Sequence, residues 1–154
     1  MGKPRPTDDP AVKAALVCAM LREDHPLVSS VTETETKTLV IKNPSDDGPF
    51  GTLYNLNLYR GCGHGCIYCD SRSECYGIID ISRIEIKRNA IALLRKELSR
   101  KRQKGVICTG SMNDPYMLLE AEVGLTRQAL EVVLERGFGI HVITKSTLVL
   151  RDID

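Results

Sequence analysis

After Gly51 the chain alternates between short segments that read as strands and longer segments that read as helices. Residues 53–59, 106–109 and 138–144 are short and rich in apolar residues, whereas residues 89–105 and 126–137 repeat apolar residues at helical spacing. Strands separated by helices of this length are typical of βαβ units, whose right-handed crossovers make the sheet parallel. The pattern therefore predicts an α/β fold.

The two expected helices carry boundary signals of their own. Asn89 is placed to cap the first helix, and Gly105 ends it. Thr126 is expected to begin the second helix, which ends before Gly137. The apolar residues that this second helix is expected to bury are Leu130, Val133 and Leu134.

Residues 1–50 differ from the rest because six prolines divide them into short pieces. Only residues 11–23 read as a helix. Residues 31–38 alternate threonine with charged residues, which leaves an exposed edge strand and a solvated linker both open. The predicted organisation is an N-terminal extension over residues 1–50 with one short helix, followed by the α/β region over residues 51–154.

The overall charge points to no particular class of partner, because 21 Lys and Arg face 20 Asp and Glu. The apolar stretch over residues 11–21 is interrupted by Lys13, is about half as long as a membrane span, and lacks a small-residue cleavage site. We therefore expect a cytoplasmic protein without membrane contact. Six cysteines that are unevenly spaced fit a reducing compartment and a metal site better than a disulfide framework.

Positive charge is concentrated between Arg83 and Lys104, where nine Lys or Arg and two Glu leave a local net charge of +7. Such a patch can contact phosphates, so nucleic acid is one expected partner. The commoner explanation is the solvated face of an amphipathic helix, and no aromatic residues are interleaved with these charges.

The strongest local signal is a CxxxCxxC run formed by Cys62, Cys66 and Cys69 in a glycine-rich loop. Thiolates bind both iron–sulfur clusters and zinc. Three closely spaced thiolates can hold three corners of a cubane and leave the fourth iron open. The alternative is structural zinc closed by Cys75, although zinc sites more often use two cysteine pairs separated by a longer loop. The spacing favours the cluster.

Two further polar segments follow expected strands. One is the loop that contains Ser111, Asn113 and Asp114, and the other begins at Lys145. Because parallel strands deliver their carboxyl ends to one edge, we expect both segments to meet the cysteine loop. Taken singly, Asp114 before Pro115 is more often a turn, and Lys145 is an ordinary surface residue.

At Cys62, Cys66, Tyr68 and Cys69 the sequence resembles the radical S-adenosylmethionine superfamily, whose signature is CxxxCx(aromatic)C. The wider runs over residues 58–69, 110–116 and 144–146 are similar to the branch related to spore photoproduct lyase, often labelled DNA repair photolyase. The resemblance extends over residues 50–154.

This resemblance implies both a fold and a chemistry. The fold is a set of parallel βα units forming the first half of a partial TIM-like (β/α)6 barrel. The chemistry is that of a lyase-like enzyme that reductively cleaves S-adenosylmethionine at a [4Fe–4S] cluster to give a 5′-deoxyadenosyl radical, with nucleic acid as a candidate substrate. It also implies a one-electron reductant of the flavodoxin or ferredoxin type. Half a barrel would be a fragment that self-associates or is completed by another chain.

The resemblance assigns the cluster to Cys62, Cys66 and Cys69, with the cofactor's methionine on the fourth iron. The remaining implied cofactor-binding residues are Tyr68 near the adenine, Ser111, Asn113 and Asp114 at the amino group, and Lys145 at the carboxylate. Many relatives carry a Gly-Gly-Glu run where this chain has residues 110–114. The rival function is a non-catalytic zinc or redox module that uses the same three cysteines and Cys75.

Overall fold

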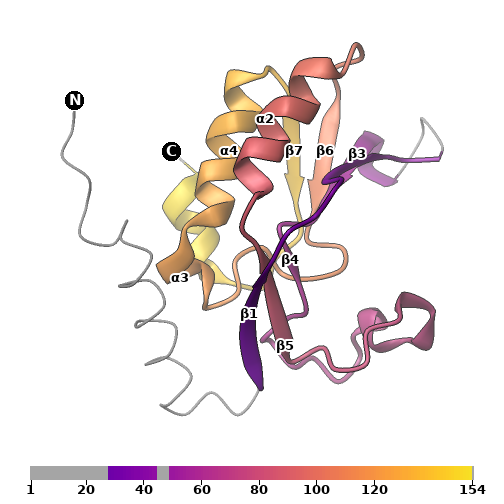
Figure 1. Ribbon diagram of the computed structural model, residues 1–154, viewed down its shortest axis with the longest axis vertical. Helices are drawn as coiled ribbons and strands as arrows, with labels where there is room; N and C mark the ends of the chain where they lie inside the picture. The colour runs from indigo at the N-terminus through magenta and orange to yellow at the C-terminus, as the bar shows by residue number, and fades with distance from the viewer. Residues whose placement is uncertain (1–27, 45–48, 154) are drawn as a thin grey trace.

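The structure is a computed structural model that describes residues 28–44 and 49–153. The helix expected over residues 11–23 lies outside the described residues. Within them, the strands form two sheets of mixed orientation, one with the order β1-β5-β4 and one with the order β2-β3-β6-β7 (Figure 1).

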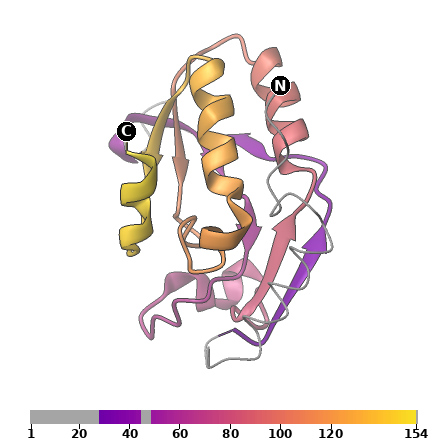
Figure 2. The same cartoon turned by 90° about the vertical axis from the view of Figure 1, so that its left-hand side faces the viewer.

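The four-stranded sheet contains β2 (Val40–Lys42), β3 (Thr52–Leu56), β6 (Val106–Thr109) and β7 (Gly139–Val142). The strands β3, β6 and β7 are parallel, and β2 is antiparallel to β3. The helices α2 (Ala90–Arg100) and α4 (Leu125–Glu135) lie side by side and cover one face of this sheet (Figures 1 and 2).

Apolar stripes on these two helices explain why they pack on the sheet. The α2 helix buries Ala90, Leu94 and Leu98, which recur at helical spacing, and α4 buries Ala129 and Val133 in the same way. Removing this apolar surface from water is the main stabilising contribution to such a layer. Of the residues expected to be buried on α4, Val133 is buried, Leu130 is half-buried, and Leu134 is 81% exposed.

The three-stranded sheet contains β1 (Ser30–Thr34), β5 (Arg83–Lys87) and β4 (Tyr59–Arg60). The central strand β5 pairs in parallel with β1 and antiparallel with β4. Ile84 and Ile86 on β5 face the core, and the residues that alternate with them, Arg83, Glu85 and Lys87, are charged. Of residues 31–38, which left an edge strand and a linker open, residues 31–34 lie in the edge strand β1 and residues 35–38 lie in no strand.

The predicted fold, parallel βα units forming the first half of a partial TIM-like barrel, is wrong. Both sheets contain an antiparallel pair, and the described residues close no barrel. The sequence reasoning treated residues 53–59 as one strand, whereas the chain leaves β3 at Leu56, and Tyr59 joins the other sheet. It also assigned no strand to β2 or β5. With three residues, β2 is too short to establish a period, whereas β5 does alternate Ile84 and Ile86 with charged residues and was missed.

A buried carboxylate joins the short helix α3 (Glu120–Val123) to its surroundings. Glu120 is fully buried and accepts hydrogen bonds from the Thr126 amide (3.0 Å), from the Tyr59 hydroxyl and from Arg151 (3.1 Å). Burial and the Glu120 carboxylate raise the pKa of Tyr59 well above its usual value of 10.0, so the phenol keeps its proton and donates. Arg151 lies on the 3₁₀ helix η5 (Thr147–Asp152), which this contact anchors.

No helix in the described part of the chain is both long enough and apolar enough to cross a bilayer.

Candidate functional site

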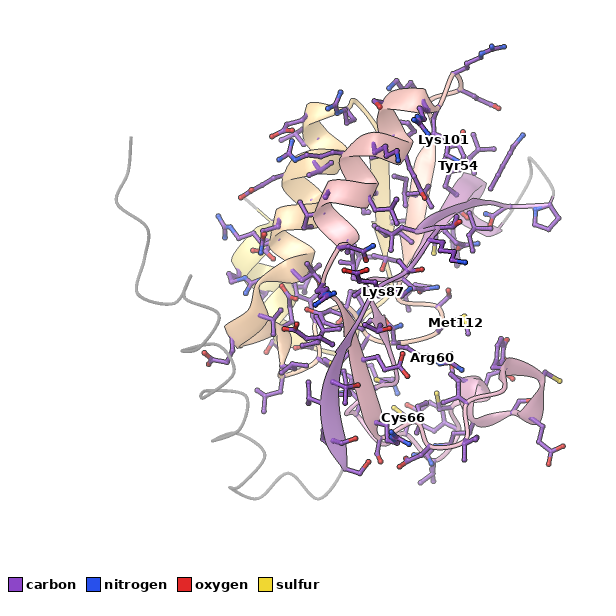
Figure 3. All side chains as sticks on the ribbon, viewed as in Figure 1. Tyr54, Arg60, Cys66, Lys87, Lys101 and Met112 are labelled. Carbon is purple, nitrogen blue, oxygen red and sulfur yellow. The ribbon has the colours of Figure 1, made fainter. Side chains whose placement is uncertain are left out.

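The three segments that the sequence singled out line one pocket of about 110 Å³. The cysteine loop contributes all three thiols, the loop after β6 contributes residues 110–114, and the segment after β7 contributes residues 143–145. Figure 3 shows Cys66 at the end of the molecule opposite to Lys101 and Tyr54. The pocket is smaller than the range of about 300–1,000 Å³ that holds most organic ligands. A nucleoside-containing cofactor bound here would extend beyond it.

The start of the cysteine loop is packed tightly against β5. Gly61 has φ +80°, and a Cβ on it would stand 2.1 Å from the carbonyl oxygen of Arg83. The next residue, Cys62, donates its amide hydrogen to the carbonyl oxygen of Ile81 at 2.7 Å. A glycine is therefore required at position 61, and the backbone of the first cysteine is fixed.

Burial raises the pKa of the Cys62 thiol, and the backbone amides of His64 and Asp114, which hydrogen-bond the sulfur, oppose this rise. Cys62 is 9% exposed, whereas Cys66 and Cys69 are half-buried. Amide donors directed at a sulfur stabilise it as a thiolate. This environment suits a sulfur that is bound to a positively charged metal centre.

The Asp114 carboxylate joins its own loop to the segment after β7 and lies close to the cysteine loop. Its Oδ1 accepts hydrogen bonds from the Tyr116 amide (2.8 Å) and the Thr144 hydroxyl (2.7 Å), and its Oδ2 accepts from the Lys145 amide (2.8 Å). His64 Nε2 lies 3.0 Å from Oδ2, at an angle that makes no hydrogen bond. The bond to Tyr116 is the turn expected of an Asp before a proline. Both carboxylate oxygens are thus engaged within the protein.

Asn113 differs from Asp114 because one of its polar atoms has no partner. Its side chain is 6% exposed and donates through Nδ2 to the carbonyl oxygen of Tyr59 at 2.7 Å. Its Oδ1 is buried without a hydrogen-bond donor. Ser111, the third acceptor suggested by the sequence, is exposed at the rim of the pocket. A buried amide oxygen without a donor is destabilising unless a ligand supplies one.

Lys145 brings a cation to the thiols. Its Nζ lies 3.1 Å from Cys66 Sγ, contacts the Tyr68 hydroxyl and stands 4.1 Å above the centre of the Tyr68 ring. Hydrogen bonding to Tyr68 and then to Cys66 raises the pKa of the Lys145 ammonium above its usual 10.5. Tyr68 itself is 76% exposed. The sequence reasoning expected this lysine at the site but did not foresee its contact with a cysteine.

Cys75, the fourth ligand of the zinc alternative, lies apart from the other thiols along the chain in η4 (Glu74–Tyr76). It is exposed and does not line the pocket. Within residues 28–44 and 49–153, no three His, Cys, Asp or Glu side chains are arranged as a ready-made metal site. Cys108 is buried, at 7% exposed, and its sulfur lies 3.6 Å from His141 Nδ1, a contact that the sequence reasoning missed.

A second pocket, of about 440 Å³, adjoins the first and shares Met112 and Asn113 with it. Its other walls include Arg60 on β4 and Lys87 on β5. The sequence reasoning missed both residues. The alternation of Ile84 and Ile86 with charged residues in β5 would have been the signal, because it separates a core face from a polar face.

Part of the basic patch of residues 83–104 is paired within the chain. Arg88 pairs with Glu35 and Arg95 with Glu135. Lys101 lies over the Tyr54 ring, and Lys104 donates to the carbonyl oxygen of Arg136. Two of the nine cations are therefore paired with carboxylates, whereas the ring and carbonyl contacts of Lys101 and Lys104 leave their charges in place.

No family model matches the sequence, and no solved structure matches it. The chain is similar to an uncharacterized protein of Methanocaldococcus jannaschii, 36% identical over 108 residues that make up 68% of this chain and 39% of the relative. It is also similar to uncharacterized proteins of Mycobacterium tuberculosis and Mycobacterium bovis, each 31% identical over 108 residues, 65% of this chain and 32% of the relative. The chain therefore spans less than two fifths of the length of the curated relatives it matches.

Proposed function

We propose that this chain binds a [4Fe–4S] cluster through Cys62, Cys66 and Cys69 and belongs to a radical S-adenosylmethionine enzyme. The observation that carries the proposal is that the three thiols line one pocket together with an unpartnered amide oxygen and a lysine ammonium. When bound, the cluster and cofactor supply one-electron cleavage of a carbon–sulfur bond, which generates a 5′-deoxyadenosyl radical. A reductant of the flavodoxin or ferredoxin type would supply the electron.

The residues around the thiols can bind the ammonium and the carboxylate of a methionine. Asn113 Oδ1 is buried without a donor, so an ammonium bound there would satisfy it. The Lys145 side chain is exposed, and a carboxylate is a natural partner of its ammonium. The exposed ring of Tyr68 offers a surface for a purine outside the pocket. Asp114 accepts a hydrogen bond from the Lys145 backbone amide and so fixes the backbone at that residue.

Pocket geometry also supports the choice of cysteine ligands. Cys62, Cys66 and Cys69 share the pocket, while Cys75 lies outside its lining residues. A cluster that needs three protein thiolates leaves one iron for the cofactor, whereas structural zinc would use Cys75 as well.

Anaerobic reconstitution followed by chromatography for 5′-deoxyadenosine tests the function. Reconstituted chain given dithionite and S-adenosylmethionine should form 5′-deoxyadenosine, and Cys66→Ala should form none. Cys75→Ala is the matched control and should behave as the parent chain. A reconstituted chain that carries four irons yet forms no 5′-deoxyadenosine would contradict the proposed chemistry.

A further inference from the structure

The larger pocket next to the thiols carries two cations, and neither of them forms an ion pair within residues 28–44 and 49–153. Arg60 and Lys87 both line it. Arg60 donates to the carbonyl oxygen of Gly77 at 3.2 Å, and Lys87 donates to the carbonyl oxygen of Asn57 at 2.6 Å. A carbonyl oxygen uses one of the protons of each group and neutralises neither charge. Both cations keep unused donors.

The carboxylates of this pocket do not cancel the two cations. Glu35 also lines the pocket, but its carboxylate pairs at 2.6 Å with Arg88, which is not among the lining residues. That leaves Glu85, which lies opposite Arg60 in the strand register. Two cations and one unengaged carboxylate leave a net charge of +1. Burial and then the like charge of Arg60 lower the pKa of Lys87, and the Glu85 carboxylate only partly opposes them. An anion between the two groups would relieve both effects.

One uncharged residue of the same pocket has a side-chain oxygen that receives no hydrogen bond. Asn57 Oδ1 is buried and has no hydrogen-bond partner, although the backbone oxygen of the same residue accepts from Lys87. Buried amide oxygens are rarely left without a donor. A ligand in this pocket is therefore expected to bring an N–H or O–H group as well as a negative charge.

We propose that this second pocket binds an organic anion that carries hydrogen-bond donors, of the class of phosphate esters with hydroxyl or amino groups. Arg60 and Lys87 bind the phosphate, and Asn57 Oδ1 accepts from a hydroxyl or amino group. The pocket volume of about 440 Å³ is large enough for an organic ligand of this kind. Figure 3 shows Arg60, Lys87 and Met112 between Cys66 and the end that carries Lys101.

A ligand in this pocket would lie beside the thiols, because Met112 and Asn113 line both pockets. The idea that this ligand is the substrate of the radical reaction rests on the function proposed above. Binding of the anion does not, because the groups that recognise it are all protein side chains. The test can therefore be made without iron, and its failure is distinguishable from failure of the cluster chemistry.

Calorimetric titration of the full chain without iron tests the proposal, with glucosamine 6-phosphate and inorganic phosphate as probes. Both should bind, and Lys87→Met and Arg60→Gln should each weaken both by roughly tenfold or more, the loss expected for a charge-assisted hydrogen bond. Asn57→Leu should weaken glucosamine 6-phosphate and leave inorganic phosphate unchanged. Lys96→Met, on the exposed face of α2, is the matched charge control and should change neither.

Three results would overturn the proposal. Equal affinity of the parent chain and Lys87→Met for glucosamine 6-phosphate would rule out the anion site. Arg60→Gln provides the same decision if Lys87→Met does not fold, since Arg60 is exposed. Displacement of glucosamine 6-phosphate by S-adenosylmethionine would assign the pocket to the cofactor instead.

Discussion

Asp114 shows how far a single residue could be interpreted from sequence. Its position after a strand predicted that it would meet the other two segments of the site; it accepts hydrogen bonds from Thr144 and Lys145 after β7, and His64 of the cysteine loop lies 3.0 Å away. The sequence could not show that both oxygens would be taken up by protein donors, because those donors are backbone amides and a hydroxyl that no side-chain pattern reveals. Asn113, its neighbour, keeps the free acceptor.

Asp114→Ala should therefore reduce stability before it affects chemistry. The substitution leaves two amides and the Thr144 hydroxyl without an acceptor, and we expect the free energy of unfolding to fall by about 3 kcal/mol. Thr144→Val, which removes one of these bonds, should cost about 1 kcal/mol. Urea denaturation of the iron-free chain measures both. An Asp114→Ala chain as stable as its parent would return Asp114 to a direct role in ligand binding.

At the scale of elements, the sequence predicted the positions of helices and strands better than it predicted which residues they contact. The expected segments over residues 106–109 and 138–144 contain β6 and β7, α2 lies within its expected range, and α4 begins at Leu125, one residue before the expected start at Thr126. Asn89 does precede α2, yet its side chain makes no cap. It accepts from the Thr36 amide at 3.1 Å and donates to the Thr36 carbonyl oxygen at 2.8 Å. Local periodicity indicates where a helix or strand lies, whereas long-range contacts such as that between Asn89 and Thr36 depend on tertiary packing.

The 3₁₀ helix η5 is held by a buried ion pair that can be broken from one side. Arg151→Met leaves the fully buried Glu120 carboxylate without its cation, so we expect the free energy of unfolding to fall by about 3–5 kcal/mol. Arg127→Met removes an exposed partner of Asp152 and should cost less than about 1 kcal/mol. Thermal and urea unfolding compare the two variants. Equal losses would contradict the distinction between a buried and an exposed pair.

For the whole molecule, the sequence indicated an α/β class but not its topology. Mixed sheets depend on which short strands pair, and β4, with two residues, contains no readable pattern. The meeting of the three polar segments in one pocket was easier to predict than the fold, because their residues carry recognisable functional groups and follow strands. Its second pocket was not predictable, since Arg60, Lys87 and Asn57 come together only through strand pairing.

Stability should be uneven across the molecule and should respond to the metal. Amides of β6 and of the buried face of α2 should exchange slowest, because Ile107, Leu94 and Leu98 are fully buried. Amides of residues 67–79, where Ile67 and Ile79 are exposed, should exchange fastest. Cluster binding should slow exchange between Cys62 and Cys69 first, because ligation orders the loop that supplies the ligands. Hydrogen exchange with mass spectrometry measures this, and protection that stays unchanged in that loop would contradict ligation there.

Iron content after anaerobic reconstitution tests the central claim most directly. The parent chain and Cys75→Ala should each hold about four irons and four sulfides per chain, with the broad brown absorbance of a cubane. Cys62→Ala, Cys66→Ala and Cys69→Ala should each lose that absorbance. Tightly bound zinc at one per chain, lost when Cys75 is replaced, would contradict the account and establish the structural zinc site in its place.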